Sequence, residues 1–118
     1  MLIPKPSQDD KAKFHGLVPA VRGVEAKPMF GNLGGFVNGN MFMGLFGSAI
    51  GVKLSDDDAA ALRAIHGAGP FGPVDRPMSS YVALPAKWSE EEAAPWIGKA
   101  LVFVGAMQPK VKKPKAKR

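Results

Sequence analysis

The sequence predicts an α+β domain of two layers, in which helices cover one face of an antiparallel five-stranded sheet. Three observations predict this fold. The length of 118 residues fits a single domain. Segments with the i, i+3, i+4 spacing of amphipathic helices alternate with short segments in which every second residue is apolar. In chain order they form one helix, three strands, one helix, two strands and one helix, or α-β3-α-β2-α.

The first predicted helix follows a proline-rich segment, residues 1–7, which we expect to be loose. Ser7 stands at the start of the helix, where its hydroxyl can accept from a free N–H group of the first turn. The apolar face consists of residues at helical spacing, Phe14, Leu17 and Val18. Pro19 is predicted to end the helix, because proline lacks a donor and restricts the residue before it.

Residues 24–54 are predicted to form the first three strands as a meander. The glycine-rich stretch over residues 31–35 indicates a bend or bulge within the first strand. Asn38-Gly39 predicts a tight hairpin turn, because both residues tolerate a positive φ. Residues 41–46 are apolar on both faces, which is typical of a central strand, and alternation resumes at Ile50, Val52 and Leu54.

The second predicted helix begins with Ser55 as its cap, and the acidic run Asp56–Asp58 favours the positive end of the helix dipole. The helix is expected to end before Gly67. Its apolar stripe consists of Ala59, Leu62 and Ile65. After a loop rich in glycine and proline, two short strands are predicted on either side of residues 75–77, the second over residues 78–84.

The third predicted helix has the clearest local signals. Ser89 with Glu92 three residues later matches a capping box, in which each side chain accepts from the other residue's backbone N–H. The amphipathic pattern that follows consists of Ala93, Trp96, Ile97, Ala100, Leu101, Val104 and Met107. Pro95 lies inside this pattern, so either the helix starts nearer Ala94 or it kinks at Pro95. The domain is predicted to span residues 8–108.

The net charge of +6 is concentrated at one end of the chain. Six basic residues follow Pro109 without an acidic one: Lys110, Lys112, Lys113, Lys115, Lys117 and Arg118. The other residues include ten basic and ten acidic side chains, so the body of the chain is neutral. Because residues 109–118 have too little apolar surface to fold, they are predicted to be a disordered basic tail.

The composition also indicates a compartment. The chain contains no cysteine, which excludes disulfides, thiol nucleophiles and cysteine metal ligands and favours a reducing environment. The first residues lack the apolar run of a signal peptide, and the longest nearly apolar stretch, residues 41–52, is too short to span a bilayer. We therefore expect a cytoplasmic protein that does not contact a membrane.

Two stretches of the chain are distinctive. Residues 27–42 read Lys-Pro-Met-Phe-Gly, then a glycine-containing strand, a short turn and a second apolar strand. Residues 76–85 read Arg-Pro-Met and continue into a strand with an aromatic residue. Over residues 22–108 this pattern resembles the N-terminal domain of the TfoX (Sxy) family, named for a bacterial regulator of competence for DNA uptake. The resemblance implies an α-β3-α-β2-α fold in a stand-alone single-domain member, and it brings no catalytic residues.

Motifs that would indicate catalysis or cofactor binding have simpler structural explanations. Gly67–Gly72 matches Gly-x-Gly-x-x-Gly, but it follows a helix instead of a strand, and Pro70 lacks an N–H for a phosphate. Asp56–Asp58 is explained as a helix start, and neither His15 nor His66 has a second metal ligand nearby in sequence. Nucleophile-elbow and phosphate-loop motifs are absent. We expect no enzyme, metal or cofactor.

Arg76 and Tyr81 are the candidate partner or ligand contacts of the folded body. Both are expected near one end of the sheet, and Tyr81 is expected to point away from the face that carries Val82 and Leu84. Structural packing is the favoured alternative. Packing in the core is likewise favoured over an adaptable binding groove for the methionines in apolar patterns, Met29, Met41, Met43, Met78 and Met107.

These features predict a non-enzymatic domain that acts through protein or nucleic-acid contacts in bacterial gene regulation or competence. The tail lysines would hold phosphates as point charges, so the expected contact is non-specific binding of DNA or RNA. The neutral body would engage an unidentified protein partner or a second copy of itself, through a sheet edge at residues 24–30 or 78–84. The alternative function is a small-molecule-binding module or cryptic enzyme with a pocket near Arg76 and Tyr81.

Overall fold

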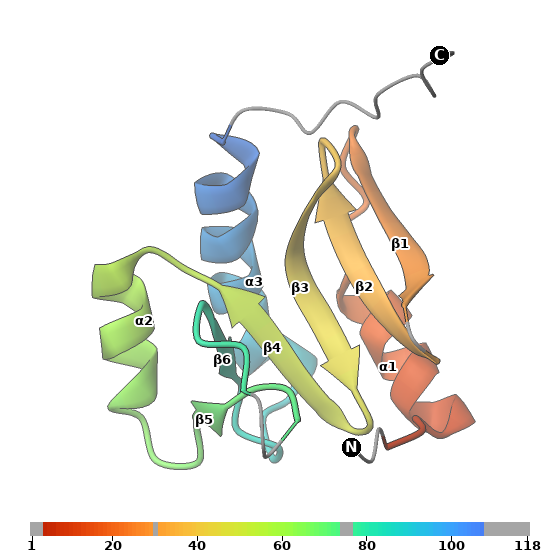
Figure 1. Ribbon diagram of the computed structural model, residues 1–118, viewed down its shortest axis with the longest axis horizontal. Coiled ribbons are helices and arrows are strands. Elements are labelled where there is room, and N and C mark those ends of the chain that lie inside the picture. Colours follow the sequence, from red (N-terminus) through yellow and green to blue (C-terminus); the bar gives the residue numbers. More distant parts are fainter. Residues whose placement is uncertain (1–3, 30, 74–76, 108–118) are drawn as a thin grey trace, which may run out of the picture.

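The computed structural model describes residues 4–29, 31–73 and 77–107. These residues form an α+β fold with three helices and one antiparallel sheet (Figure 1). In chain order the elements are α1 (Gln8–Leu17), β1 (Val24–Met29), β2 (Asn32–Val37), β3 (Asn40–Phe46), β4 (Ala49–Lys53), α2 (Asp56–Arg63), β5 (Gly69–Pro70), β6 (Tyr81–Ala83) and α3 (Glu90–Gly105). The predicted tail and Arg76 lie outside the described residues.

The described part of the sheet has six strands in the order β1-β2-β3-β4-β6-β5, so the prediction of five strands is wrong. The additional strand arises because the chain reverses between β1 and β2, where Met29 pairs with Asn32. Gly31 has a φ of 81° in this reversal, a conformation that glycine adopts without the steric cost of a side chain. The element order is therefore α-β4-α-β2-α.

A β-bulge between β2 and β3 explains an interruption of the alternating pattern. Phe36 pairs with Met41, whereas the preceding Gly35 pairs with Met43, so Phe42 is an extra residue in β3. Phe42 and Met43 are consecutive, yet both are fully buried in the core beneath the helices. The bulge thus lets two neighbouring side chains point to one face. The glycine-rich stretch, in which a bend or bulge was predicted, holds the reversal at Gly31, and its last residue, Gly35, lies opposite the bulge in β3.

The predicted hairpin at Asn38-Gly39 is confirmed. Asn38 has a φ of 51° and Gly39 a φ of 84°, as a two-residue turn between antiparallel strands requires. Val37 and Asn40 pair directly on either side of the turn. This hairpin sets the register of β2 against β3, which matters for the site described below.

Serine side chains cap all three described helices, as predicted. Ser7, Ser55 and Ser89 accept from the backbone N–H three residues later, and the first and third caps are complete capping boxes. Of the two alternatives predicted for α3, a start near Ala94 is wrong, because the helix begins at Glu90 and contains Pro95. The second helix is shorter than its apolar stripe suggested and ends at Arg63.

The helices lie on one face of the sheet and form the main core with it (Figure 1). Phe14 of α1, Leu62 of α2 and Ile97 of α3 belong to one buried cluster with the strand residues Phe42 and Val52. The opposite face of the sheet, here called the open face, carries a smaller buried cluster built on Phe71, Tyr81 and Ala83. The two-layer arrangement leaves part of the open face without a covering helix.

One of the two predicted sheet edges is an edge in the structure and the other is not. Residues 78–84 do not provide a free edge, because β6 pairs with β4 on one side and with β5 on the other. Residues 24–29 do form an edge strand, and Pro28 within it lacks the N–H that an added strand would need. Among the described residues, no helix has both the length and the apolar character to cross a membrane.

Candidate binding site on the open face of the sheet

Three glycines lie side by side across the centre of the sheet. Gly34 of β2 pairs with Gly44 of β3, which in turn pairs with Gly51 of β4. We call these three residues the glycine row. Strand residues normally project a side chain from each pleat, so three adjacent glycines leave a shallow lane in the open face.

Phe71 fills one end of this lane. A Cβ atom added to Gly51 would lie 2.4 Å from Cγ of Phe71, which shows that the ring rests directly on the glycine backbone. Phe71 is almost completely buried, and its ring lies 6.3 Å from that of Phe46 and 6.1 Å from that of Tyr81. The segment after β5 therefore covers Gly51 but not the whole row.

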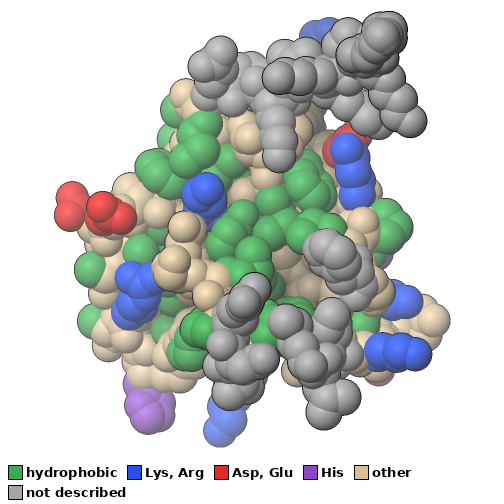
Figure 2. Space-filling view, in the orientation of Figure 1, with side chains coloured by type: hydrophobic (Ala, Val, Ile, Leu, Met, Phe, Trp, Pro, Cys, Tyr) green, Lys and Arg blue, Asp and Glu red, His purple; other side chains and the backbone are tan. Residues whose placement is uncertain are grey.

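Gly44, in the middle of the row, lies beside the far end of the Phe71 ring and also lines a cavity of about 410 Å³. Gly44 lies in the lining, and the walls are apolar: Met29, Leu33, Met41, Phe46, Phe71 and Met78. Figure 2 looks onto this face and shows hydrophobic side chains gathered near its middle. We call this feature the Gly44 cavity.

Asn32 is the polar side chain in the lining, and it is already hydrogen-bonded. Its Oδ1 accepts from the backbone N–H of Gly47 at 2.8 Å, and its Nδ2 donates to the carbonyl oxygen of Pro4 at 3.1 Å. Both ends of the buried amide therefore have partners. Asn32 connects the start of β2 to the β3–β4 turn and to the segment before α1.

Tyr81 lies on the open face, on the side of β6 opposite Val82 and Leu84, which belong to the main core. Its hydroxyl donates to the backbone carbonyl of Met41 at 2.9 Å. Burial raises the pKa of this hydroxyl from 10.0 to about 12, because the phenolate would lose its hydration. Tyr81 thus supports the wall formed by Phe71 and does not itself line the Gly44 cavity.

The methionines divide between the two faces. Packing in the core was predicted for five methionines. Met43 is fully buried in the main core and Met107 packs against that core, in agreement with this prediction. Met29, Met41 and Met78 instead line the Gly44 cavity. The sequence feature that could have indicated the cavity is the set of glycines in neighbouring strands. Whether these glycines lie side by side depends on the strand register, which the sequence does not reveal.

The sequence was compared with models of known protein families. The sequence model of the TfoX N-terminal domain matches residues 17–104. The chain belongs to the TfoX N-terminal domain family. Comparison with curated proteins and with solved structures gave no match. Both stretches that carried the resemblance contribute to the lining of the cavity. Residues 27–42 contribute Met29, Asn32 and Met41, and residues 76–85 contribute Met78.

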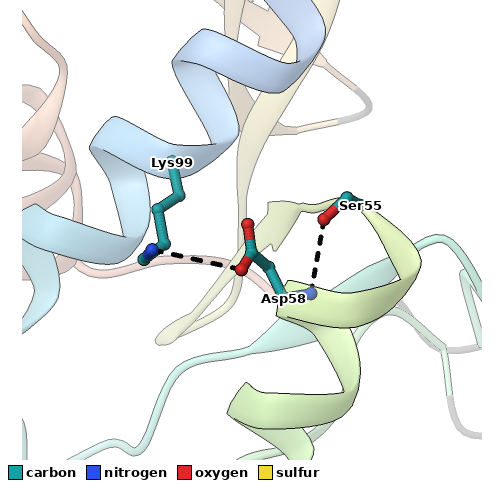
Figure 3. A network of polar contacts seen from close by, with 3 residues as sticks. All are labelled: Ser55, Asp58 and Lys99. Carbon is teal, nitrogen blue, oxygen red and sulfur yellow. Dashed lines mark hydrogen bonds and ion pairs between the residues drawn. The ribbon is translucent and has the colours of Figure 1, made fainter.

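Acidic residues of this TfoX domain have structural roles at helix starts. Figure 3 shows that Ser55 Oγ accepts from the backbone N–H of Asp58, while Asp58 Oδ1 lies 4.0 Å from Nζ of Lys99 on α3. The pair links α2 to α3 at the surface. Within residues 4–29, 31–73 and 77–107, no group of three acidic, histidine or cysteine side chains is arranged to hold a metal ion.

The glycine-rich segment after α2 does not form a dinucleotide site in the TfoX domain. Gly69 and Pro70 pair with Ala83 and Val82 as the short strand β5, and no helix begins directly after them. A phosphate would therefore meet no helix N-terminus here. His15 and His66 are both exposed, one on α1 and one after α2, so the two histidines do not form a shared site.

A second surface of the TfoX domain lies between α2 and α3. Val102 on the outer side of α3 is 73% exposed, unlike its neighbour Val104, which is fully buried. Together with Gly98 and Phe103 it lines an open groove of about 510 Å³, and Asp58 and Lys99 lie at the same groove. We call this the outer groove of α3.

Proposed function

We propose that this TfoX-family protein is a non-enzymatic regulatory domain of the bacterial cytoplasm that acts through contacts with nucleic acid and protein. The family fits a role in competence or regulation. The observation that carries the proposal is the separation of charge along the chain: ten basic and ten acidic residues up to residue 108, and six basic residues with no acidic one after it. Such a distribution suits a folded body with an electrostatic arm.

Nucleic acid is the partner proposed for the arm. Lysine side chains bind phosphates as point charges and release counterions, which gives affinity without base recognition. The arm contains no aromatic residue, so base stacking would add nothing there. The proposed contact is therefore non-specific, and DNA and RNA are both suitable.

Protein is the partner proposed for the body, through the outer groove of α3. Val102 is the most exposed large apolar side chain of the described residues, and it lies beside Phe103 in the groove, so a partner seated there would bury apolar surface of both. The last residue that lines the groove is Phe103, six positions before residue 109, where the proposed arm begins in the sequence. A protein held there would lie close to any nucleic acid held by the arm.

A non-enzymatic function agrees with the chemistry of the open face. Among the described residues that line the Gly44 cavity, none has an acidic, basic or imidazole side chain that could transfer a proton. Tyr81 has its hydroxyl engaged with Met41. The carboxylates described above serve as helix caps or lie in a surface pair.

Fluorescence anisotropy with labelled duplex DNA and single-stranded RNA tests the nucleic-acid contact. The full chain is compared with a chain that ends at Gln108 and with a full-length variant in which the six basic tail residues are glutamine. We expect binding by the full chain at about 100 mM salt and at least tenfold weaker binding by both variants. Equal binding by all three chains would place the contact elsewhere.

Selection of displayed peptides on the immobilised full chain tests the protein contact. We expect selected peptides to bind the protein and Val21→Lys equally, and Val102→Lys at least tenfold more weakly. Val21 is the matched control because, among the described residues, it is the other large exposed apolar side chain, at 52% exposure, and it does not line the outer groove. Peptides that bind Val102→Lys with unchanged affinity would contradict this part of the proposal.

A further inference from the structure

We propose that the Gly44 cavity is a binding site for a small, uncharged molecule rich in hydrocarbon, about the size of two or three linked aromatic rings. The inference goes beyond the proposed function, because it concerns neither the basic tail nor the outer groove of α3. It rests on the size of the cavity, on the origin of its shape and on the chemistry of its walls.

The size of the cavity suits a small molecule. Its volume of about 410 Å³ lies within the range of roughly 300–1,000 Å³ for ligand pockets. It exceeds the roughly 150 Å³ of an engineered apolar cavity that accepts benzene. A molecule with two or three rings would therefore fill it, whereas a single aliphatic side chain of a partner protein would leave much of it empty.

The floor of the cavity depends on one member of the glycine row, Gly44. A Cβ at Gly44 would lie 3.3 Å from the nearest carbon of Phe71, so any larger side chain would occupy the floor of the cavity. At Gly34 a Cβ would lie 2.9 Å from Cε1 of Phe36 and 3.1 Å from Sδ of Met41, so neighbouring side chains already fill the space above that glycine. Gly44 is the member of the row that lines the cavity. A β-branched residue, which is common in central strands, would place its side chain on the cavity floor there.

The chemistry of the walls selects an uncharged ligand. A charged group buried in the cavity would lose its hydration, and the described residues of the lining offer it no counter-charge. The amide of Asn32 already makes hydrogen bonds at both ends, so it offers little to a polar ligand. Apolar and aromatic molecules give up no hydrogen bonds to water on entering such a site, and they bury apolar surface of their own.

Three methionines make the walls adaptable. Met29, Met41 and Met78 have flexible, polarizable side chains that can close around ligands of different outline and make favourable contacts with ring edges. Phe71 supplies a fixed aromatic surface, held by Tyr81 behind it. The site thus combines one rigid wall with mobile ones, which suits a family of related aromatic ligands.

Fluorescent probes that share one skeleton test the proposal on the full-length protein. N-phenyl-1-naphthylamine is uncharged and becomes fluorescent in apolar sites, and 8-anilinonaphthalene-1-sulfonate adds a sulfonate to the same rings. We expect saturable binding of the uncharged probe with one site per chain, and at least tenfold weaker binding of the sulfonate. No saturable binding of the uncharged probe, or tighter binding of the sulfonate, would overturn the inference.

Matched variants place the probe. Gly44→Val fills the floor of the cavity, whereas Gly69→Val adds the same atoms where nothing lies within 4 Å of the new Cβ. We expect at least a tenfold loss of affinity for the first and no change for the second. Met78→Gln, which puts an amide in the wall, is expected to weaken binding even if Gly44→Val does not fold. Unchanged affinity in the folded Gly44→Val or Met78→Gln protein would overturn the assignment.

Discussion

The hydroxyl of Tyr81 donates a hydrogen bond to the backbone carbonyl of Met41 at 2.9 Å, and in doing so it links β6 to β3 across the intervening β4. Met41 lies beside the bulge at Phe42, where the regular ladder of β2 and β3 is interrupted. The contact therefore holds together the part of the open face where strand pairing is irregular, and it positions Tyr81 against Phe71 at one wall of the Gly44 cavity.

The buried hydroxyl predicts an unusual titration. Because Tyr81 is the one tyrosine in the chain, phenolate absorbance near 295 nm reports on it alone. Since burial raises its pKa, we expect the folded protein to show a midpoint of about 12. The unfolded chain in guanidinium is the control, with an expected midpoint of about 10. Equal midpoints for the folded and unfolded protein would show that the hydroxyl is not buried.

The same shift predicts how stability depends on pH. The pKa is higher in the folded state, so the contribution of Tyr81 to the free energy of unfolding is complete below about pH 10 and decreases as the pH rises towards 12. We expect the stability difference between the protein and Tyr81→Phe to narrow over this range. Urea unfolding of both proteins at several pH values measures it, and a constant difference would contradict the prediction.

Substitutions in the glycine row predict a contrast in stability. Gly51→Ala places a Cβ 2.4 Å from the Phe71 ring, so we expect the free energy of unfolding to fall by about 1–3 kcal/mol through overpacking. Gly69→Ala has open space and is expected to change stability by less than about 0.5 kcal/mol. Urea unfolding distinguishes the two. Equal effects would mean that Phe71 does not rest on the row.

Two valines on α3 provide a second contrast. Val104 is fully buried, so Val104→Ala is expected to cost about 2 kcal/mol of stability through lost burial and the cavity left behind. Val102 is 73% exposed, and Val102→Ala is expected to change stability by less than about 0.5 kcal/mol. Thermal and urea unfolding measure both. A large loss for Val102→Ala would show that the residue packs inside the fold and is not free for a partner.

The capping box of α3 predicts a local effect. Ser89 Oγ accepts from the backbone N–H of Glu92 at 3.3 Å, and Glu92 Oε1 accepts from the backbone N–H of Ser89 at 3.1 Å. Ser89→Ala is expected to destabilise the protein by about 1 kcal/mol. Ser79→Ala is the control, since the contact recorded for Ser79 is made by its backbone oxygen. Similar unfolding midpoints for the two variants would contradict the role of the cap.

Local signals account for what the sequence predicted correctly. The caps at Ser7, Ser55 and Ser89 and the turn at Asn38-Gly39 depend on contacts within four residues, so they are visible in the sequence itself. The reversal at Gly31 was missed because a single glycine in a glycine-rich stretch suits a bulge as well as a turn. Because this turn was interpreted as a bulge, β1 and β2 were counted as one strand, and five strands were predicted in place of six.

The candidate site depended on non-local information. The pairing of Gly34, Gly44 and Gly51 is a matter of register between three strands, and the bulge at Phe42 shifts that register by one residue. Tyr81 was placed on the correct face by alternation, but its contact with Met41 joins residues 40 positions apart. The sequence therefore indicated which side chains are apolar and not which of them surround a cavity.

The salt dependence of nucleic-acid binding by the full chain tests the proposed function most directly. With up to six phosphate contacts from the basic tail, the logarithm of the binding constant should fall against the logarithm of salt concentration with a slope between about −3 and −5. The chain that ends at Gln108 should show no measurable binding over the same range. Binding that survives the truncation with an unchanged slope would contradict the account and move the contact to the neutral body.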